Sequence, residues 1–105
     1  AMNDDLQPLQ VADLSLAQLE LLFRDLEYAT ESLLEVRVKG GAEERSNPLA
    51  SLELSAQLSV ARSGIRARSV RGVQIWYRFQ GDTFCDTVIV AGASFRLVRS
   101  RVPEH

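Results

Sequence analysis

The sequence has very few of the residues that build metal sites, disulfides and nucleophilic catalytic centres. It contains one cysteine, Cys85, and one histidine, His105, in 105 residues. A zinc site needs three or four ligands, so a single chain does not supply a Cys/His site. A lone cysteine forms no internal disulfide, and a histidine at a frayed chain end is a poor general base. We therefore expect no metal, no cofactor and no catalytic residues, and hence a protein that is not an enzyme.

Long apolar runs are also missing. No stretch approaches the roughly 20 apolar residues that span a bilayer, and no charged-then-apolar leader precedes Leu6. Ala1 before Met2 is typical of a cloning remnant, which makes Met2 the expected natural start. Together with the lone thiol, these features favour a cytoplasmic protein without membrane association.

The composition is that of an ordinary folded domain. Hydrophobic residues make up 46% and charged residues 25% of the chain, close to the averages for globular proteins. A chain of this length buries about 65% of its surface on folding, which is enough for a core without disulfides. We expect one domain over residues 14–101, preceded by a flexible polar arm over 1–13 and followed by a tail over 102–105.

Charge is distributed unevenly between the two halves of the chain. Residues 1–53 hold eleven acidic and four basic residues, whereas residues 54–105 hold three acidic and eight basic ones. Such polarity can arrange two copies head to tail, or it can reflect acidic helices packed on a basic sheet within one domain. The second explanation is the simpler one, and we favour it.

The first half of the chain predicts a helix and, less distinctly, a strand. Ser15 followed by Gln18 makes a capping-box pattern, and leucines then recur at three- and four-residue steps. This pattern predicts an amphipathic helix over about 15–30. Alternating apolar and charged residues over 34–39 fit a short extra edge strand, but they also fit the continuation of that helix.

A second amphipathic helix is expected near the middle of the chain. Asn47-Pro48 supplies an N-cap with proline at the first helical position, an apolar stripe runs to about Ser63, and Gly64 is placed to end the helix. A basic connection over 65–71 follows. Four arginines lie in or beside it: Arg62, Arg66, Arg68 and Arg71. Successive guanidinium groups suit a phosphate, but we interpret them as solvated charges that offset the acidic first helix.

The last third predicts a three-stranded antiparallel β-meander. Three β-rich runs, 73–80, 83–90 and 94–100, are separated by short segments that contain glycine. Gly81-Asp82 between two such runs is typical of a two-residue hairpin turn. The expected fold class is therefore α+β, with two amphipathic helices packed on one face of this meander.

The predicted register brings a polar cluster onto the apolar face of the meander. A turn at Gly81-Asp82 pairs Tyr77 with Asp86, and the second hairpin pairs Asp86 with Arg99. A carboxylate between a guanidinium and a phenol can orient a small ligand. A structural ion pair at the end of the sheet is the more common explanation, and both interpretations stay open.

The opposite face of the meander carries aromatic, basic and apolar side chains. Five of them form a candidate interface: Trp76, Arg78, Ile89, Arg96 and Val98. Tryptophan and arginine anchor many protein interfaces, and they also stack on and bind single-stranded nucleic acid. An acidic pI near 5.4 and a single tryptophan favour protein contact over nucleic acid.

These observations predict a small protein that acts through protein–protein contact. We expect self-association through the sheet, as a homodimer, because uncovered apolar sheet faces are rare on monomers. Single-stranded nucleic-acid binding on the Trp/Arg face, or small-ligand binding near the polar cluster, are the alternatives.

Overall fold

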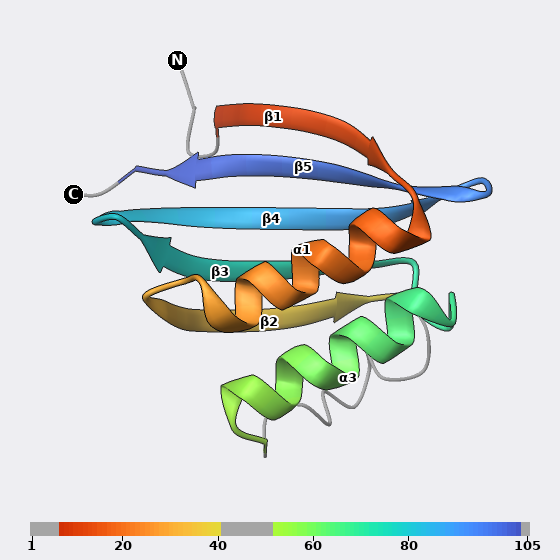
Figure 1. Ribbon diagram of the computed structural model, residues 1–105, viewed down its shortest axis with the longest axis horizontal. Helices are drawn as coiled ribbons and strands as arrows, with labels where there is room; N and C mark the ends of the chain where they lie inside the picture. The colour runs from red at the N-terminus through yellow and green to blue at the C-terminus, as the bar shows by residue number, and fades with distance from the viewer. Residues whose placement is uncertain (1–6, 41–51, 104–105) are drawn as a thin grey trace.

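The computed structural model describes residues 7–40 and 52–103, and shows five strands and two helices (Figure 1). In chain order they are β1 (Gln7–Leu14), α1 (Leu16–Tyr28), β2 (Ser32–Lys39), α3 (Leu54–Arg66), β3 (Gly72–Phe79), β4 (Asp82–Ala91) and β5 (Ser94–Val102). The strands form one antiparallel sheet in the order β1-β5-β4-β3-β2, so β4 is the central strand. The α+β class is confirmed, but the sheet has five strands rather than the three expected.

Both helices pack on the same face of the sheet, and α3 lies beside β2 at its edge (Figure 1). One continuous cluster of buried apolar side chains joins the two helices to the strands. Its most enclosed members are Leu19, Phe23 and Leu26 of α1, Ala61 and Ile65 of α3, and Val73, Ile75 and Val88 of the sheet. The predicted placement of the helices on one face is confirmed.

The start of α1 follows the predicted capping box. Ser15 Oγ accepts a hydrogen bond from the Gln18 amide at 3.2 Å, and Gln18 Oε1 accepts one from the Ser15 amide at 2.8 Å. This exchange satisfies two of the amide groups that a helix start leaves unpaired. The helix ends with a C-cap at Ala29, one residue short of the expected limit.

Residues 34–39, for which the sequence allowed either a strand or the continuation of the helix, form part of strand β2. It pairs with β3 in antiparallel fashion, and its register shifts between Leu33 and Glu35. Val36 is buried and Val38 packs against the core, whereas Arg37 between them lies on the other face. The alternation over 34–39 therefore marks a half-buried strand rather than the end of a helix.

The second helix differs from the prediction at its C-terminal end. It continues through Gly64 to Arg66, with Glu53 as its N-cap, and the predicted cap at Asn47-Pro48 lies outside the described residues. Ile65 is fully buried, so the turn after Gly64 contributes to the core. Gly64 therefore lies within the helix and does not end it, and a Cβ atom there would make an ordinary contact with Val70 at 3.4 Å.

A strand occupies most of the segment that was expected to be a flexible arm. Gln7–Leu14 forms β1, which pairs antiparallel with β5, and β5 itself extends to Val102. Leu14 is buried and Ala12 packs on the core, which holds the strand in place. Sequence reasoning missed it because Pro8 lowers strand propensity, although proline is tolerated on an edge strand such as this one.

The β3–β4 turn lies one residue earlier than predicted. Gln80 and Gly81 have φ angles of +52° and +85°, the combination of a type I′ turn. Tyr77 consequently pairs with Phe84, not with Asp86. A shift of two in the pairing keeps every side chain on its predicted face, because the side-chain period is two. The predicted pairing of β4 with β5 is confirmed.

We expect Gln80→Asn to raise the free energy of unfolding by about 0.5–1 kcal/mol, because asparagine tolerates the left-handed conformation better than glutamine. Urea denaturation measures the change, and Asp82→Asn is the matched control with little expected effect. If Gly81-Asp82 were the turn, Gln80 would occupy a strand position, and asparagine would lower stability there instead.

Candidate functional site

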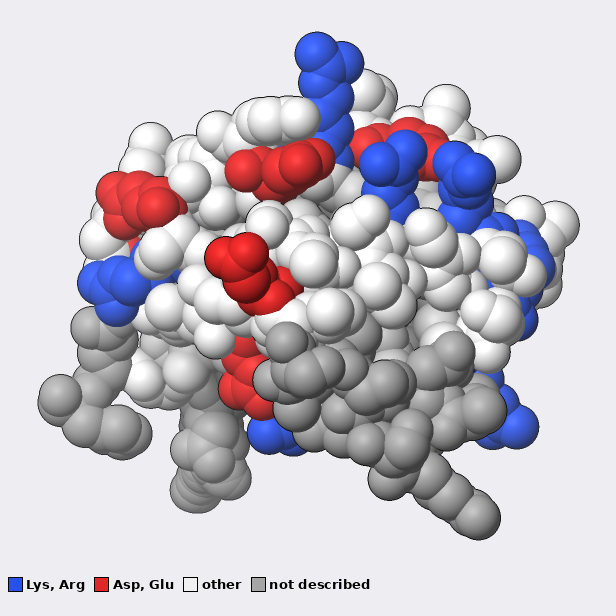
Figure 2. All heavy atoms as spheres, turned by 90° about the horizontal axis from the view of Figure 1, so that it is seen from below, with Lys and Arg blue, Asp and Glu red and all other residues white. Residues whose placement is uncertain are grey.

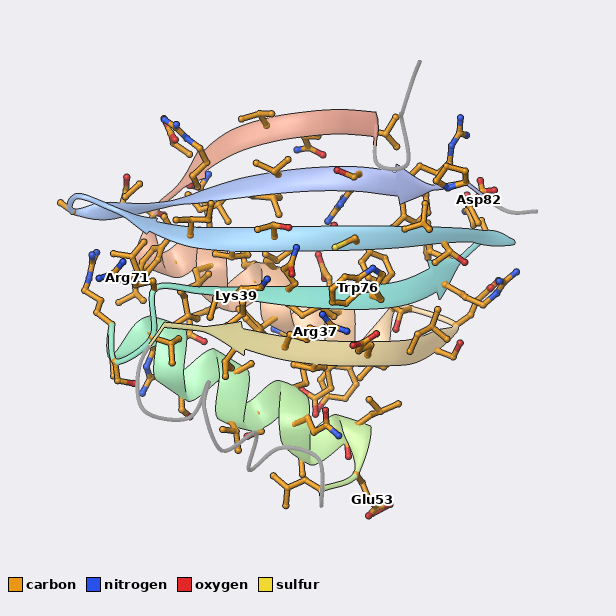
Figure 3. The ribbon with its side chains drawn as sticks, turned by 180° about the vertical axis from the view of Figure 1, so that it is seen from behind. Arg37, Lys39, Glu53, Arg71, Trp76 and Asp82 are labelled. Atoms are coloured by element: carbon orange, nitrogen blue, oxygen red, sulfur yellow. The ribbon has the colours of Figure 1, made fainter. Side chains whose placement is uncertain are left out.

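The candidate site is the sheet face that α1 and α3 leave uncovered, called the open face below. Figure 3 looks onto it, with Arg37, Lys39 and Trp76 labelled over β2 and β3. Residues paired across the strands form three rows: Lys39-Gly72-Ile89-Arg96-Asp13, Arg37-Gln74-Thr87-Val98-Val11 and Glu35-Trp76-Cys85-Ser100. Within residues 7–40 and 52–103, no helix lies on this face.

The structure brings together the five residues of the predicted interface. Trp76, Arg78, Ile89, Arg96 and Val98 all lie on the open face, as the alternation predicted. The predicted interface did not include the residues that the two edge strands add to this face. These are Val11 and Asp13 of β1 and Glu35, Arg37 and Lys39 of β2. They were not recognised because β1 was not predicted and because the sequence did not decide between a strand and a helix for β2.

Apolar side chains on the open face are accessible. Val11 is 61% exposed and Ile89 is 43% exposed, while Val98 and Trp76 are half-buried. Small or polar side chains lie between them, so the face is neither a dry core nor a purely charged surface. This mixture of an aromatic anchor, aliphatic groups and arginine is typical of protein interfaces.

The tryptophan ring on this face already has a cationic partner from the same chain. The Arg37 guanidinium lies 5.5 Å from the Trp76 ring centroid, and Arg37 also pairs with Glu35. Arg78 donates to Thr83 Oγ1 at 3.1 Å and to the Gly81 carbonyl at 3.0 Å. A nucleobase stacking on this tryptophan would compete with these contacts, which weakens the nucleic-acid interpretation.

A basic depression of about 300 Å³ opens at one end of the open face, near the start of β3. Lys39 and Arg71 flank it, Gly72 supplies no side chain, and Gln74 and Ile89 complete its walls. None of its described lining residues is acidic. At the other end of the same row, Arg96 Nε donates to Asp13 Oδ1 at 3.2 Å, which ties β5 to β1.

Cys85 belongs to the open face by its register, but its thiol is buried. It is 1% exposed, and burial raises the pKa of its thiol. The thiolate is the nucleophilic form, so a raised pKa makes this cysteine a small packing residue. Among the described residues, no group of three histidine, cysteine or acidic side chains is placed to hold a metal ion.

The predicted polar cluster is present on the opposite, helix-covered face. Arg99 holds Asp86 with two hydrogen bonds, Nε to Oδ1 at 2.9 Å and Nη2 to Oδ2 at 2.8 Å. The Tyr77 hydroxyl donates to the same Oδ1 at 3.0 Å. Asp86 is fully buried, and the side chain of Arg99 is 31% exposed. Because Tyr77 pairs with Phe84, it reaches Asp86 diagonally rather than directly across the strands.

Charge and burial perturb both partners of this carboxylate. Burial and the nearby Asp86 charge raise the pKa of the Tyr77 hydroxyl well above its ordinary value. The hydrogen bonds that Arg99 donates to Asp86 raise the pKa of the Arg99 guanidinium. Both shifts favour the protonated donors, so the cluster is a fully paired structural unit under ordinary conditions.

A shallow groove of about 300 Å³ borders the polar cluster between α1 and the sheet. Leu22, Leu26 and Phe79 give it apolar walls, and Arg99 and Asp25 lie at its polar side. The Arg99 guanidinium is already paired with Asp86, which makes it less available to a charged ligand in this groove. This groove is where a small ligand near the polar cluster would bind, and its volume is similar to that of the basic depression on the open face.

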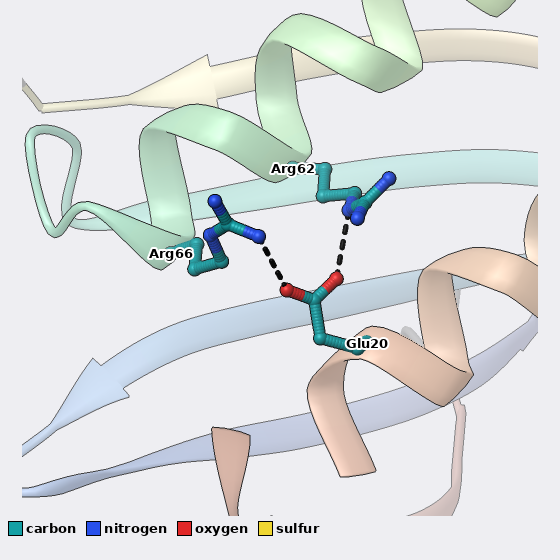
Figure 4. Close-up of polar contacts among 3 residues, drawn as sticks. All are labelled: Glu20, Arg62 and Arg66. Atoms are coloured by element: carbon teal, nitrogen blue, oxygen red, sulfur yellow. Dashed lines mark hydrogen bonds and ion pairs between the residues drawn. The ribbon is translucent and has the colours of Figure 1, made fainter. Parts of the chain in front are cut away.

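The arginines of the second helix serve the packing of the two helices. Glu20 of α1 accepts from Arg62 Nε and Arg66 Nη1, each at 2.8 Å (Figure 4). Arg68 instead donates to the Gly92 carbonyl at 2.6 Å. The view from below in Figure 2 shows acidic and basic side chains intermixed on this side. The expectation that these arginines offset the acidic helix is confirmed for Arg62 and Arg66.

No helix in the described parts of the chain is long and apolar enough to cross a membrane.

We expect Asp86→Ala to lower the free energy of unfolding by about 3 kcal/mol, because it leaves Arg99 and the Tyr77 hydroxyl without their acceptor. Thermal and urea denaturation measure the loss. The double variant Asp86→Leu/Arg99→Met removes both charges, and we expect it to recover most of the stability. An unchanged melting temperature for Asp86→Ala would mean that the carboxylate is not buried in this pair.

We expect Glu20→Gln to destabilise the protein modestly, by about 0.5 kcal/mol at pH 7, because it weakens a solvent-accessible ion-pair network. The arginines lower the pKa of Glu20 below its ordinary value of 4.5, so its stabilisation is present above that pH. It is lost as the pH falls through the lowered pKa. Denaturation at pH 7 and at successively lower pH should therefore show a difference between variant and wild type that shrinks as the pH falls below 4.5.

The chain was also compared with known proteins. No family model, no curated protein and no solved structure matches it. The function proposed below therefore rests on the geometry and chemistry of the described residues.

Proposed function

We propose that this protein is a non-enzymatic binding protein that acts through protein–protein contact and self-associates through its open face. The observation that carries the proposal is the one-sided helix cover. Among the residues that the structure describes, this arrangement leaves Trp76, Ile89, Val98 and Val11 on a sheet surface that no helix covers. Antiparallel sheets often have one face in contact with water, but the side chains on such a face are normally polar.

The size of the open face suits a stable homodimer. Five strands about 4.8 Å apart and about eight residues long give a footprint on the order of 600 Å². Two copies packed face to face would bury on the order of 1,200 Å² together, which reaches the lower end of specific interfaces. A second copy of this chain is therefore large enough to cover the whole face and form a specific interface.

Nucleic acid is the less favoured occupant of the same surface. Arg37 already lies over Trp76, Arg78 holds the β3–β4 turn, and Arg96 pairs with Asp13. Three of the arginines that could contact a phosphate backbone therefore already make contacts within the chain. The isoelectric point near 5.4 also opposes a strongly electrostatic interaction.

We expect light scattering coupled to size exclusion to give about twice the chain mass of 11.7 kDa at both about 50 mM and about 500 mM salt. Ile89→Arg places a charge in the apolar part of the face, and it should weaken dimerisation at least about tenfold. Leu21→Arg is the matched control, because Leu21 is 57% exposed on α1 and lies away from the sheet.

The control should remain a dimer. A wild-type monomer at both salt concentrations, or an Ile89→Arg variant that dimerises like wild type, would contradict the proposal. A monomer whose excess absorbance at 260 nm is removed by salt would support nucleic-acid binding in its place.

A further inference from the structure

We infer that two copies of this chain pack open face to open face about a two-fold axis that runs along β4. In this arrangement β1 of each copy lies over β2 of the other. The inference rests on the proposed self-association and adds to it the symmetry of the dimer and the residues that meet across it.

The strand order selects the position of the axis. β4 is the third of five strands, with β5 and β1 on one side and β3 and β2 on the other. A two-fold axis along the central strand exchanges the two edges and covers the whole face of both copies. An axis along any other strand would leave one edge strand of each copy uncovered. The resulting contact is isologous, so the assembly closes at two copies.

Charges at the two edges are complementary under this symmetry. Lys39 and Asp13 lie at opposite ends of the row that contains Ile89, and each is two strands from β4. The axis therefore places Lys39 opposite Asp13 of the second copy, and the contact occurs twice. Lys39 makes no ion pair with any residue that the structure describes, and the side chain of Asp13 is 66% exposed.

The same symmetry places large side chains opposite small ones. Arg96 lies over Gly72 of the second copy, and the basic depression there can hold its side chain. Asp13, which pairs with Arg96 in the same chain, offsets the charge of the arginine at this position. Trp76 lies over Ser100, which is 6% exposed and adds little height to the surface. Ile89, on the axis, meets its own copy. Such interdigitation is how two sheets fill the roughly 10 Å between them.

A two-fold axis perpendicular to the strands fits the charges less well. It keeps each strand over its own copy, so Lys39 would face the region of Ser32 at the other end of β2. Among the described residues of β2, Lys39 would then meet Ser32 and not an acidic side chain. The two Ile89 side chains would also lie on the order of 20 Å apart, instead of meeting at the axis.

A charge-swap cycle tests the proposed contact. Lys39→Asp and Asp13→Lys each place like charges opposite one another twice, and each should weaken the dimer by about tenfold or more. The double variant Lys39→Asp/Asp13→Lys restores opposite charges, so its dissociation constant should return to within about threefold of wild type. The dissociation constant is measured by sedimentation over a dilution series.

Glu27→Lys is the control for the cycle, because it makes the same charge change as Asp13→Lys on an exposed position of α1. It should leave dimerisation unchanged. Melting temperatures of all variants separate a lost contact from a lost fold.

A cross-link tests the axis independently. Ile89→Cys in a Cys85→Ala background places one thiol per copy at the axis, and a short bis-maleimide should give a covalent dimer in high yield. Leu21→Cys in the same background should not cross-link.

The possible outcomes test the symmetry of the dimer separately from self-association itself. A dimer that shows neither rescue in the double variant nor cross-linking at position 89 overturns the symmetry while self-association stands. A monomer throughout overturns both. Rescue together with cross-linking establishes the axis along β4.

Discussion

The structure depends on the helical layer that covers one face of its sheet and leaves the other face without helices in the described residues. Two helices of 13 residues each, about 20 Å long, cover one face of a five-stranded sheet. The core therefore forms on that side, where Phe23, Ile65 and Val88 are almost fully buried. The other face keeps accessible valine and isoleucine side chains, and this asymmetry is the physical basis of the proposed interface.

The same constraint explains where the polar groups lie. On the covered side, Asp86 is buried but finds three hydrogen bonds from Arg99 and Tyr77 at the border of the α1 layer, where Arg99 still reaches water. On the open side, Asp13 of β1 and Glu35, Arg37 and Lys39 of β2 lie on the edge strands, and Trp76 and Ile89 lie further in, with Arg78 and Arg96 near the ends of their strands. A charged rim around a partly apolar centre is the usual anatomy of a protein interface.

Sequence patterns predicted which face of the sheet each side chain lies on better than they predicted how many strands the sheet has. The turn at Gln80-Gly81 was placed one residue late, yet Tyr77, Asp86 and Arg99 still met, because an error of two in register leaves each side chain on its face. β1 could not be recognised, since an edge strand with Pro8 is defined by its pairing with β5 rather than by its own propensity. The basic depression likewise depends on long-range pairing, which brings Lys39 of β2 beside Gly72 of β3.

The most direct test of the account uses the single tryptophan of the chain, which lies on the open face. Its emission maximum can be followed while the protein is diluted from high micromolar to nanomolar concentration. If the open face is the interface between copies, dissociation exposes Trp76 to water, and the emission should shift to longer wavelength over the same range in which the mass halves. An emission maximum that stays constant while the mass halves would place the interface elsewhere on the molecule and contradict the account.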